Sequence, residues 1–403
     1  MNRMRFGIFM APFHLPNTRS VNIALHRDVQ LVQLCDELGF DEAWFGEHHS
    51  CGCELIGDPM TMIAYTAPIT DRIKLGTGVV SLPYHNPFWM AERAIQLDHL
   101  TRGRAMLGLG PGALAKDAAM IGMDPVEQRD AFEEDVDVLM HLIRSPEPLS
   151  IKTSRYELRE ALVQIPPYTD FEVLIAAVVS PSGPRIAGKH GLSLLSLAAT
   201  SQAEVLSKHR AILEDRAVEF AVPAAPREAW RLVAPMHIAE TRKAAYEEVR
   251  YGIDVWFDYR QHVTPSPQFA GIGDTTEERI RWVVESGLGV IGTPEDAIEQ
   301  IRQMQRMSSP TGGEEDGFGT LLISEYEWAR TDAVERSHRL FADEVMPAFQ
   351  FAALDRRRIT EASARETAES LNAKMVEAVE VAKRKHEDDV ARRAAPDSEG
   401  STR

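Results

Sequence analysis

The amino-acid sequence predicts an α/β protein folded as a (β/α)8 barrel, or TIM barrel, with insertions and a C-terminal helical extension. The first observation is a set of eight short segments that are apolar throughout, as strands buried on both faces should be. The second is the helical pattern that recurs between them. The third is the length of 403 residues, which accommodates a barrel of about 250 residues with insertions. A doubly wound sheet would give the same alternation, but eight evenly repeated units favour a closed barrel.

The eight predicted strands are dominated by aliphatic and aromatic residues. In chain order they are Arg5–Met10, Glu42–Phe45, Arg72–Val80, Ala105–Gly110, Glu172–Ala177, Leu192–Leu197, Arg231–Ala239 and Phe318–Ser324. The N-terminal segment superficially resembles a signal peptide. However, Gly7, Pro12 and Pro16 interrupt its apolar part, and no small-residue cleavage site follows. We therefore interpret it as the first buried strand.

Helical spacing marks the segments between the strands. Leu31, Leu34, Cys35 and Leu38 fall on one face of a helix, and Gly39 is placed to end that helix. This pattern predicts an amphipathic helix after the first strand.

A second helix start lies near the end of the predicted barrel. Thr293 is a favourable N-cap, Pro294 suits the first helical position, and two acidic residues follow in the first turn. The residues expected to face the core of this helix are Ala297, Ile298, Ile301 and Met304.

The chain is expected to divide into a barrel domain, residues 1–355, and a charged C-terminal segment, residues 356–403. Two insertions, at about 145–170 and 251–292, interrupt the barrel pattern, and long loops of this kind are often lids or mobile segments. The last segment predicts a long exposed helix followed by a disordered tail.

That C-terminal helix carries a thin apolar stripe formed by Leu371, Met375, Val379 and Ala382. Two interpretations stay open, a solvated helix and a contact in an oligomer.

Charge and composition limit the possible partners and locations. The chain has 44 basic and 61 acidic residues, a formal charge of −17, which disfavours nucleic acid and anionic membranes as partners. No apolar run approaches the length of about 18 residues that predicts a transmembrane helix. The chain has three cysteines, which is a small and odd number, whereas a secreted disulfide scaffold has several paired ones. A cytoplasmic location is therefore expected.

The candidate site residues lie at the carboxyl ends of the predicted strands, where barrel enzymes carry their chemistry. Phe13 follows the first strand, His48 and His49 the second, and Tyr84 and His85 the third. One histidine acting in acid–base chemistry or hydrogen bonding is the favoured interpretation.

A metal site is the alternative for this loop, because Cys51 and Cys53 follow the two histidines. Zinc sites usually separate their cysteines by two to four residues. Here a single residue separates them, and adjacent histidines do not readily turn toward one ion. No metal site is therefore predicted.

Two further motifs lie at strand ends. Ser180 and Ser182 precede a predicted helix, where they either bind a phosphate or simply cap the helix. The glycine-rich run Gly108–Gly112 contains neither a Walker nor a Rossmann motif. Glycine there indicates a close backbone approach or a positive φ angle.

Taken together, the motifs resemble the bacterial luciferase-like flavin monooxygenases. The matching pieces span about Arg5 to Phe349 and are RFGIF, ELGFDEAWFGEHH, LIGDP, RIKLGTGVVSLPYHNP, ERAIQLDHLTRGRAMLGLG, GKHGL, GTPEDAIEQI and VMPAF. The variant GLGPGALAKDAAMIG together with SLPYHNP is most similar to the branch that includes limonene 1,2-monooxygenases.

The resemblance implies an enzyme that binds FMN at the C-terminal mouth of the barrel. Reduced flavin would come from a separate flavin reductase and react with O2, and one oxygen atom would enter a small apolar substrate such as a terpene or another alkene. The resemblance also implies a homodimer or a homotetramer, the assemblies usual in the family. Two alternatives remain: an F420-dependent oxidoreductase that transfers hydride, and a non-catalytic luciferase-like subunit.

The resemblance also assigns roles to individual residues. His48 would be the catalytic histidine, which donates a hydrogen bond to the oxygenated flavin or assists proton transfer. The Gly78–Val79 peptide would be cis beneath the flavin ring, and Ser180 would lie near its phosphate. The other cofactor-binding positions are Gly110, Ser182 and Gly183. The substrate pocket is expected to include the strand-end and loop residues Phe13, His49, Cys51, Tyr84 and His85 and, as an aromatic residue of the second insertion, Trp256.

Some positions depart from the family pattern. Bacterial luciferase has a Cys-Arg pair where this chain has Gly110 and Pro111. Its second phosphate hydroxyl is replaced by Gly183. Arg185 or Lys189 could supply the missing positive charge.

Overall fold

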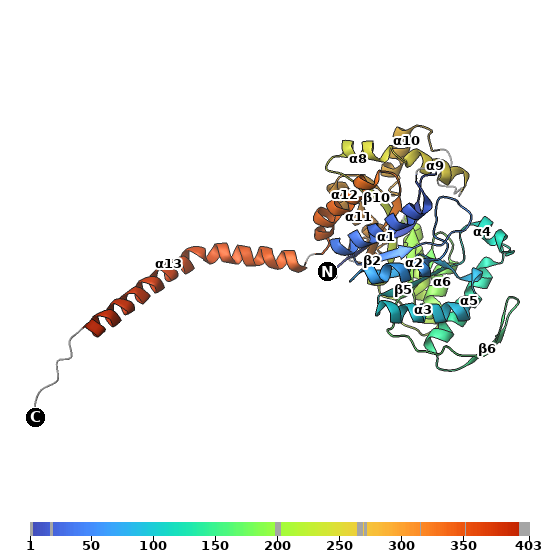
Figure 1. Cartoon of the computed structure of the whole chain (residues 1–403), viewed down its shortest axis with the longest axis horizontal. Coiled ribbons are helices and arrows are strands. Elements are labelled where there is room, and N and C mark those ends of the chain that lie inside the picture. Colours follow the sequence, from blue (N-terminus) through green and yellow to red (C-terminus); the bar gives the residue numbers. More distant parts are fainter. Residues whose placement is uncertain are drawn as a thin grey trace, which may run out of the picture. The chain divides into compact units, whose positions relative to one another are not determined.

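A closed barrel of eight parallel strands forms the centre of the protein. The computed structural model describes residues 3–16, 19–197, 203–263, 269, 272–314, 316–350 and 352–394. The strand order is β1-β2-β3-β5-β8-β9-β10-β12, and β12 pairs with β1 to close the ring. This arrangement confirms the predicted barrel (Figure 1).

Each barrel strand coincides with a predicted segment. Their bounds are β1 (Arg5–Phe13), β2 (Glu42–Phe45), β3 (Lys74–Thr77), β5 (Ala105–Gly110), β8 (Val173–Ala177), β9 (Ser193–Leu197), β10 (Arg231–Ile238) and β12 (Thr320–Tyr326). The third prediction is wrong in extent, because the strand expected over 72–80 is interrupted at Gly78. The chain then resumes as β4 (Val80–Ser81), which pairs with β5 farther along. A short additional strand, β11 (Val290–Gly292), pairs with the end of β10.

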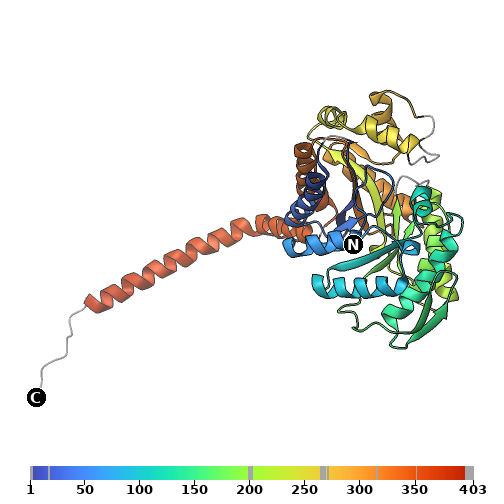
Figure 2. The same ribbon diagram turned by 45° about the vertical axis from the view of Figure 1, so that its right-hand side comes forward.

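Helices surround the barrel, as Figures 1 and 2 show. Helix α1 ends where its glycine was predicted to end it, since Gly39 has a φ angle of 89°. Helix α11 begins with the predicted Thr293 cap, which forms a reciprocal capping box with Asp296. The helices of the barrel unit are α1 (Val21–Leu38), α2 (Pro59–Thr66), α3 (Pro87–Thr101), α4 (Ala115–Met120), α5 (Gln128–Arg144), α6 (Ser182–His190), α7 (Ala203–Glu219), α8 (Arg242–Val249), α9 (Ile253–His262), α10 (Thr276–Glu285), α11 (Pro294–Ser308) and α12 (Thr331–Leu340).

The two insertions contain regular structure. The first forms an antiparallel hairpin of β6 (Leu149–Lys152) and β7 (Glu157–Ala161). The second forms α9, α10 and β11, and α8, α9 and α10 lie together at one end of the barrel (Figure 1). Aromatic residues hold α9 in place, so the described part of the second insertion is a packed element of the fold and contains an aromatic cluster.

The barrel interior is filled with side chains, as barrels of this size require. Trp44 on β2 is fully buried there. The rest of this interior cluster consists of Phe9, Met106, Leu174, Leu195, Val233 and Leu322, with Leu197 packed against it.

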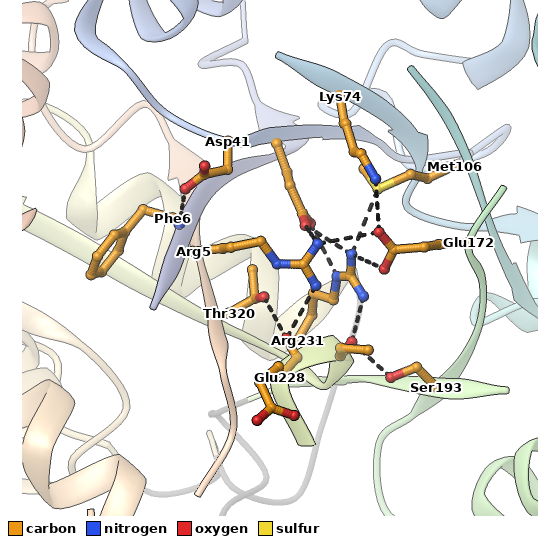
Figure 3. A network of polar contacts seen from close by, with 12 residues as sticks. Arg5, Phe6, Asp41, Lys74, Met106, Glu172, Ser193, Glu228, Arg231 and Thr320 are labelled. Carbon is orange, nitrogen blue, oxygen red and sulfur yellow. Dashed lines mark hydrogen bonds and ion pairs between the residues drawn. The ribbon is translucent and has the colours of Figure 1, made fainter. Parts of the chain in front are cut away.

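A ring of charged side chains closes the end of the barrel where the strands begin (Figure 3). Arg231, at the start of β10, is fully buried and binds Glu42 through two nitrogen atoms at 2.8 and 3.0 Å. Its guanidinium also lies 2.6 Å from Glu172 Oε2. Arg5 and Lys74 approach Glu172 Oε1 at 3.2 and 2.9 Å.

These contacts neutralise the buried charges of the ring. Burial alone would raise the pKa of Glu172, but Arg231, Arg5 and Lys74 hold it well below its ordinary value. A buried charge is costly unless it is paired and hydrogen-bonded. Glu172 and Arg231, whose pKa values the pairing lowers and raises respectively, therefore keep their charges across the physiological pH range.

The C-terminal helix α13 (Ala352–Ala394) belongs to a second structural unit, residues 350–403, beyond the barrel unit of residues 1–349. It is one continuous helix of 43 residues, which confirms the predicted helical extension. The tail predicted after it lies outside the described residues. Among the helices of the described part, none combines the length and apolar composition that crossing a membrane requires.

Candidate active site

Glu47 organises the polar cluster at the carboxyl end of β2. Its side chain is fully buried, and its carboxylate lies 2.7 Å from His85 Nε2 and 3.2 Å from His49 Nε2. It also accepts a hydrogen bond from the backbone N–H of Ser81, in β4. One carboxylate thus joins the ends of β2 and β3, and it brings two of the predicted pocket residues together.

His48 lies between two carboxylates. Its Nε2 atom is 2.9 Å from Glu54 Oε2, and its Nδ1 atom is 3.5 Å from Asp117 Oδ2. Burial alone would lower the pKa of His48, but the charge of Glu54 and the nearby Asp117 carboxylate raise it to about 10. His48 is therefore a protonated imidazolium at neutral pH, and it can hold or donate a proton.

Asp117 comes from a different loop of the barrel, on the short helix α4 after β5. Its Oδ1 atom accepts hydrogen bonds from the Ser50 hydroxyl and from the backbone N–H of His49. Burial opposes ionisation, yet hydrogen bonds from His48 and Ser50 hold the pKa of Asp117 below its ordinary value. This carboxylate ties the loop after β2 to the loop after β5.

The atoms of His48, Cys51 and Glu54 that could bind a metal ion lie within 4.8 Å of one another. Two ligands about 2.0 Å from a tetrahedral ion lie roughly 3.3 Å apart. His48 Nε2 and Glu54 Oε2 are only 2.9 Å apart, which is the distance of a charge-assisted hydrogen bond. The geometry favours an ion pair over a metal centre.

Cys51 and Cys53 face an aromatic cluster contributed largely by the second insertion. Both are buried, and Phe13 packs in the same cluster with its ring 4.9 Å from that of Tyr259. Burial raises the pKa of Cys53 to about 11. Burial and the neighbouring Glu54 and Cys51 also raise the pKa of Tyr259. These side chains form an apolar wall beside the His48 pair.

Trp256 is the centre of that aromatic cluster. Its ring lies between 4.9 and 5.5 Å from the rings of Phe257, Phe269, Tyr326 and Trp328. Only 2% of its surface is exposed. These rings enclose Trp256, so its side chain supports the aromatic cluster and does not face an open cavity.

Tyr84 follows β4 and lies close to the loop after β5. Its hydroxyl accepts a hydrogen bond of 2.8 Å from Gln128, and burial raises its pKa to about 12. A Cβ atom on Gly112, whose φ angle is 93°, would approach that hydroxyl to 2.4 Å. The glycine-rich run therefore allows the β5 loop to pass directly over Tyr84.

The peptide bond between Gly78 and Val79 is cis, as the resemblance implied. A Cβ atom on Gly78 would come within 2.7 Å of the Phe9 ring, and one on Gly110 within 2.7 Å of Val79. Gly110 also faces Ala176 on β8. Side chains of Phe9, Val79 and Ala176 thus fill the space beside Gly78 and Gly110, which a larger residue at either position would need.

Ser180 and Ser182 lie at the start of α6, and their hydroxyl oxygens are 2.7 Å apart. A Cβ atom on Gly183 would meet the carbonyl oxygen of Ala176 at 2.4 Å, so glycine allows α6 to pack closely on β8. Both serines lie where free backbone N–H groups of α6 point outward.

The two possible substitutes for the missing cation lie in different surroundings. Lys189 is in the last turn of α6 and pairs with Asp137 at 2.8 Å, away from the serines. Arg185 is exposed in the first half of α6, and its guanidinium forms no ion pair with any described residue. Arg185 is thus the one of the two that is available for an anion.

An open cleft with a cavity volume of about 80 Å³ lies on the other side of β1, between α1, β12 and α12. His14 and Asp28, which line it, are 3.1 Å apart. Of the predicted pocket residues only Phe13 borders this cleft, so the cleft and the His48 cluster are separate features of the same barrel end.

The structure groups the predicted residues into three sets. His48, His49 and His85 meet around the carboxylates, and Phe13, Cys51 and Trp256 share the aromatic wall. Gly78, Val79 and Gly110 pack together beyond the ends of β3 and β5, and Ser180, Ser182 and Gly183 lie at the start of α6. Glu47 was expected at this strand end together with the two histidines, but sequence reasoning missed the carboxylates of Glu54 and Asp117. Nothing in the local sequence marked Asp117.

Comparisons with known proteins find relatives of this chain both in sequence and in structure. Residues 4–309 match the family described as luciferase-like monooxygenase. The chain is 43% identical over 349 residues to limonene 1,2-monooxygenase of Rhodococcus erythropolis, covering 86% of this chain and 87% of that protein. It is 35% identical over 356 residues to 4-hydroxyprotoasukamycin monooxygenase of Streptomyces nodosus subsp. asukaensis, covering 87% and 93%.

Solved structures share the fold at lower sequence identity. Monooxygenase RslO1 from Streptomyces bottropensis superimposes with a TM-score of 0.73 at 20% identity, over 86% of this chain and all of that one. The oxygenating constituent of 3,6-diketocamphane monooxygenase from Pseudomonas putida, solved with FMN, gives 0.70 at 22% identity, over 86% and 98%. An F420-dependent secondary alcohol dehydrogenase gives 0.62 at 16% identity, over 85% and 98%.

Proposed function

The chain belongs to the luciferase-like monooxygenases, and on that premise we propose that it is the oxygenating component of a two-component system. It would use reduced FMN, delivered by a separate flavin reductase, and O2 to add one oxygen atom to a small apolar substrate. The observation that carries the proposal is the position of His48 between Glu54 and Asp117, next to Glu47, which binds the strand after the cis peptide.

The residues at the barrel mouth fit a flavin. The cis Gly78–Val79 peptide and Gly110 lie at the carboxyl ends of β3 and β5, the end of the barrel where a planar ring would lie. Ser180, Ser182 and the N-terminal turn of α6 would hold the phosphate, and Arg185 would supply a positive charge. When bound in reduced form, the flavin would supply the electrons that activate O2.

The chain's own side chains would protect and guide this chemistry. His48 would hold a proton at the carboxyl end of β2 and could donate a hydrogen bond to an oxygen atom there. The wall of Phe13, Cys51 and Tyr259 would exclude water, because its side chains are apolar and almost fully buried. His49 and His85, both bound to Glu47, would keep the loop in place.

A cyclic monoterpene alkene is the substrate class we propose. The support is the 43% identity to a limonene 1,2-monooxygenase over most of both chains, together with the apolar wall of Phe13 and Cys51. We also propose a cytoplasmic location, since all three cysteines are free and buried, and a homodimer or homotetramer as the assembly.

One reaction tests the function. The purified chain is supplied with FMN, NADH, a flavin reductase and isotopically labelled oxygen gas, and limonene is added as substrate. We expect a limonene epoxide that carries one atom of the label, and no product when the reductase is omitted. Product without label, or no product together with tight F420 binding and hydride transfer from an alcohol, would contradict the proposal. Failure to bind either cofactor would indicate a non-catalytic subunit.

A further inference from the structure

Helix α13 has no explanation in the chemistry of the barrel. Over residues 356–394 every side chain except that of Ala368 is exposed. A helix of 43 residues that is polar on nearly every face gains little from its own side chains. Its exposed apolar residues include Leu371 and Met375, which are 54% and 65% exposed.

One face of α13 repeats in heptads. Ten positions follow one another at alternating steps of four and three residues, which is the spacing of the a and d positions of a coiled coil. They are Arg357, Glu361, Ala364, Ala368, Leu371, Met375, Ala378, Ala382, Lys385 and Asp389. The centre of this face is apolar, the next positions are alanine, and both ends are charged.

The face is complementary to its own reversed copy. When a second α13 runs antiparallel to the first, with residue 373 of both helices at the same level, Leu371 of one helix lies opposite Met375 of the other. Each of the four alanines then meets another alanine. Toward the ends, Glu361 lies opposite Lys385 and Arg357 opposite Asp389, so every charged position meets the opposite charge. A parallel pair would instead place each charge against its own copy.

We infer that α13 forms an antiparallel coiled coil with the α13 of a second copy of this chain, centred on residue 373. Alanine at the inner positions lets the two backbones approach closely. Val379 and Val381 flank the seam and extend its apolar surface, and they are 49% and 40% exposed in the single chain. Lys374 would lie beside its own copy at the edge of the seam, where solvent screens the repulsion.

The charged ends are free to make these contacts. Arg357 and Lys385 form no ion pair with any residue in the described part of the chain. Glu361 pairs with Arg365 at 2.6 Å and Asp389 with Arg392 at 3.5 Å, but all of these side chains are exposed and can exchange partners. The inference is independent of the function of the barrel, because it depends only on α13.

Disulfide crosslinking of the full chain tests the register. In the double variant Ala364→Cys/Ala382→Cys, the antiparallel pair places each new thiol opposite the other one of the second copy. We expect mild oxidation to convert most of the protein into covalent dimers on a non-reducing gel. The single variants should crosslink poorly, because the two copies of either cysteine would lie roughly 27 Å apart along the helices. The three native cysteines are buried and should not compete.

Two results would overturn the inference. Equal crosslinking of the single and double variants would indicate a parallel pair. No crosslinking of the double variant, with circular dichroism showing an intact helix, would mean that α13 does not pair in this register.

Charge reversal within the double-cysteine chain sharpens the test. Arg357→Asp places two aspartates opposite each other and should slow crosslinking about tenfold. Adding Asp389→Arg restores complementary charges and should restore the rate. The matched control is Arg356→Asp, which makes the same charge change off the seam and should leave the rate nearly unchanged. Equal slowing by Arg357→Asp and Arg356→Asp would contradict the register. So would a crosslinking rate that does not recover when Asp389→Arg is added to Arg357→Asp.

Discussion

The two ends of the barrel are both built from ion pairs, but from side chains of different chemistry. At the end where the strands begin, Arg5, Lys74 and Arg231 surround Glu42 and Glu172. At the opposite end, histidines take the place of arginine and lysine. There His48 faces Glu54 and Asp117, and His49 and His85 share Glu47.

The difference shows how one fold separates stability from chemistry. Arginine remains charged at every pH that proteins meet, so the first end holds a fixed set of charges. Histidine can gain and lose a proton, so the second end can take part in proton transfer. The first end should therefore respond to mutation in stability, and the second end in activity and pH dependence.

Loss of Arg231 should have the largest effect. Arg231→Met leaves Glu42 and Glu172 buried without their main partner, and removing one partner of a buried pair typically costs about 3–5 kcal/mol. We expect a decrease of that size in the free energy of unfolding measured with urea. The activity per folded molecule should remain close to that of the parent chain. An Arg231→Met chain with unchanged stability and low activity would contradict the assignment of stability to one end and activity to the other.

Loss of His48 should have the opposite profile. His48→Ala is expected to slow oxygen transfer about 100-fold, as loss of a positioned acid–base group commonly does, which corresponds to about 2.7 kcal/mol. Affinity for FMN, measured by fluorescence titration, should change little. His49→Ala is the matched control, and an equal loss of activity there would mean that the other ring carries the role.

Removal of one carboxylate beside His48 should change its titration. Asp117→Asn should lower the pKa of His48 from about 10 by about one unit, equivalent to about 1.4 kcal/mol. Since the folded pKa is raised, the pair stabilises the protein fully below about pH 6.5 and loses this effect as the pH rises through 10. In the variant the loss should begin at lower pH. NMR titration of the His48 imidazole measures the shift, and Asp130→Asn, at an exposed position, is the control. An unchanged pKa of His48 in Asp117→Asn would exclude the pairing of His48 with Asp117.

Lys74 should contribute least to the ring. Its side chain is 40% exposed and shares Glu172 with Arg5 and Arg231. Lys74→Met should therefore lower the free energy of unfolding by less than about 1 kcal/mol. The same urea titration gives the value. A loss as large as that of Arg231→Met would show that the ring acts as one cooperative unit.

The fold was largely predictable because its signals are local. Apolar runs located all eight strands, and Gly39 and Thr293 marked helix ends that the structure reproduces. The residue pattern did not reveal the interruption of the third strand at Gly78, since Leu75 before it and Val79 and Val80 after it are all apolar. The cis peptide itself came from the family resemblance and from no pattern of residue types.

The site was predictable only in part, because its geometry depends on distant segments. His48 could be singled out from its position after β2. Its partner Asp117 lies on another loop, and nothing near it in the sequence signals the contact. Trp256 was expected in the substrate pocket as an aromatic residue of an insertion, yet neighbouring rings enclose it. The charged ring at the other end of the barrel was not predicted, although several predicted strands begin with a charged residue.

Trp44 connects the two ends and gives the molecule an internal optical probe. Its indole N–H donates a hydrogen bond to Glu42 in the charged ring, while its Cβ atom and ring lie directly beneath Gly78 and Gly76. Tryptophan fluorescence depends on nearby charges and acceptors. The emission assigned by difference to Trp44, using Trp44→Phe, should therefore respond both to damage of the ring and to a flavin seated over Gly78. One side chain would report the integrity of the scaffold and the occupancy of the site in a single spectrum.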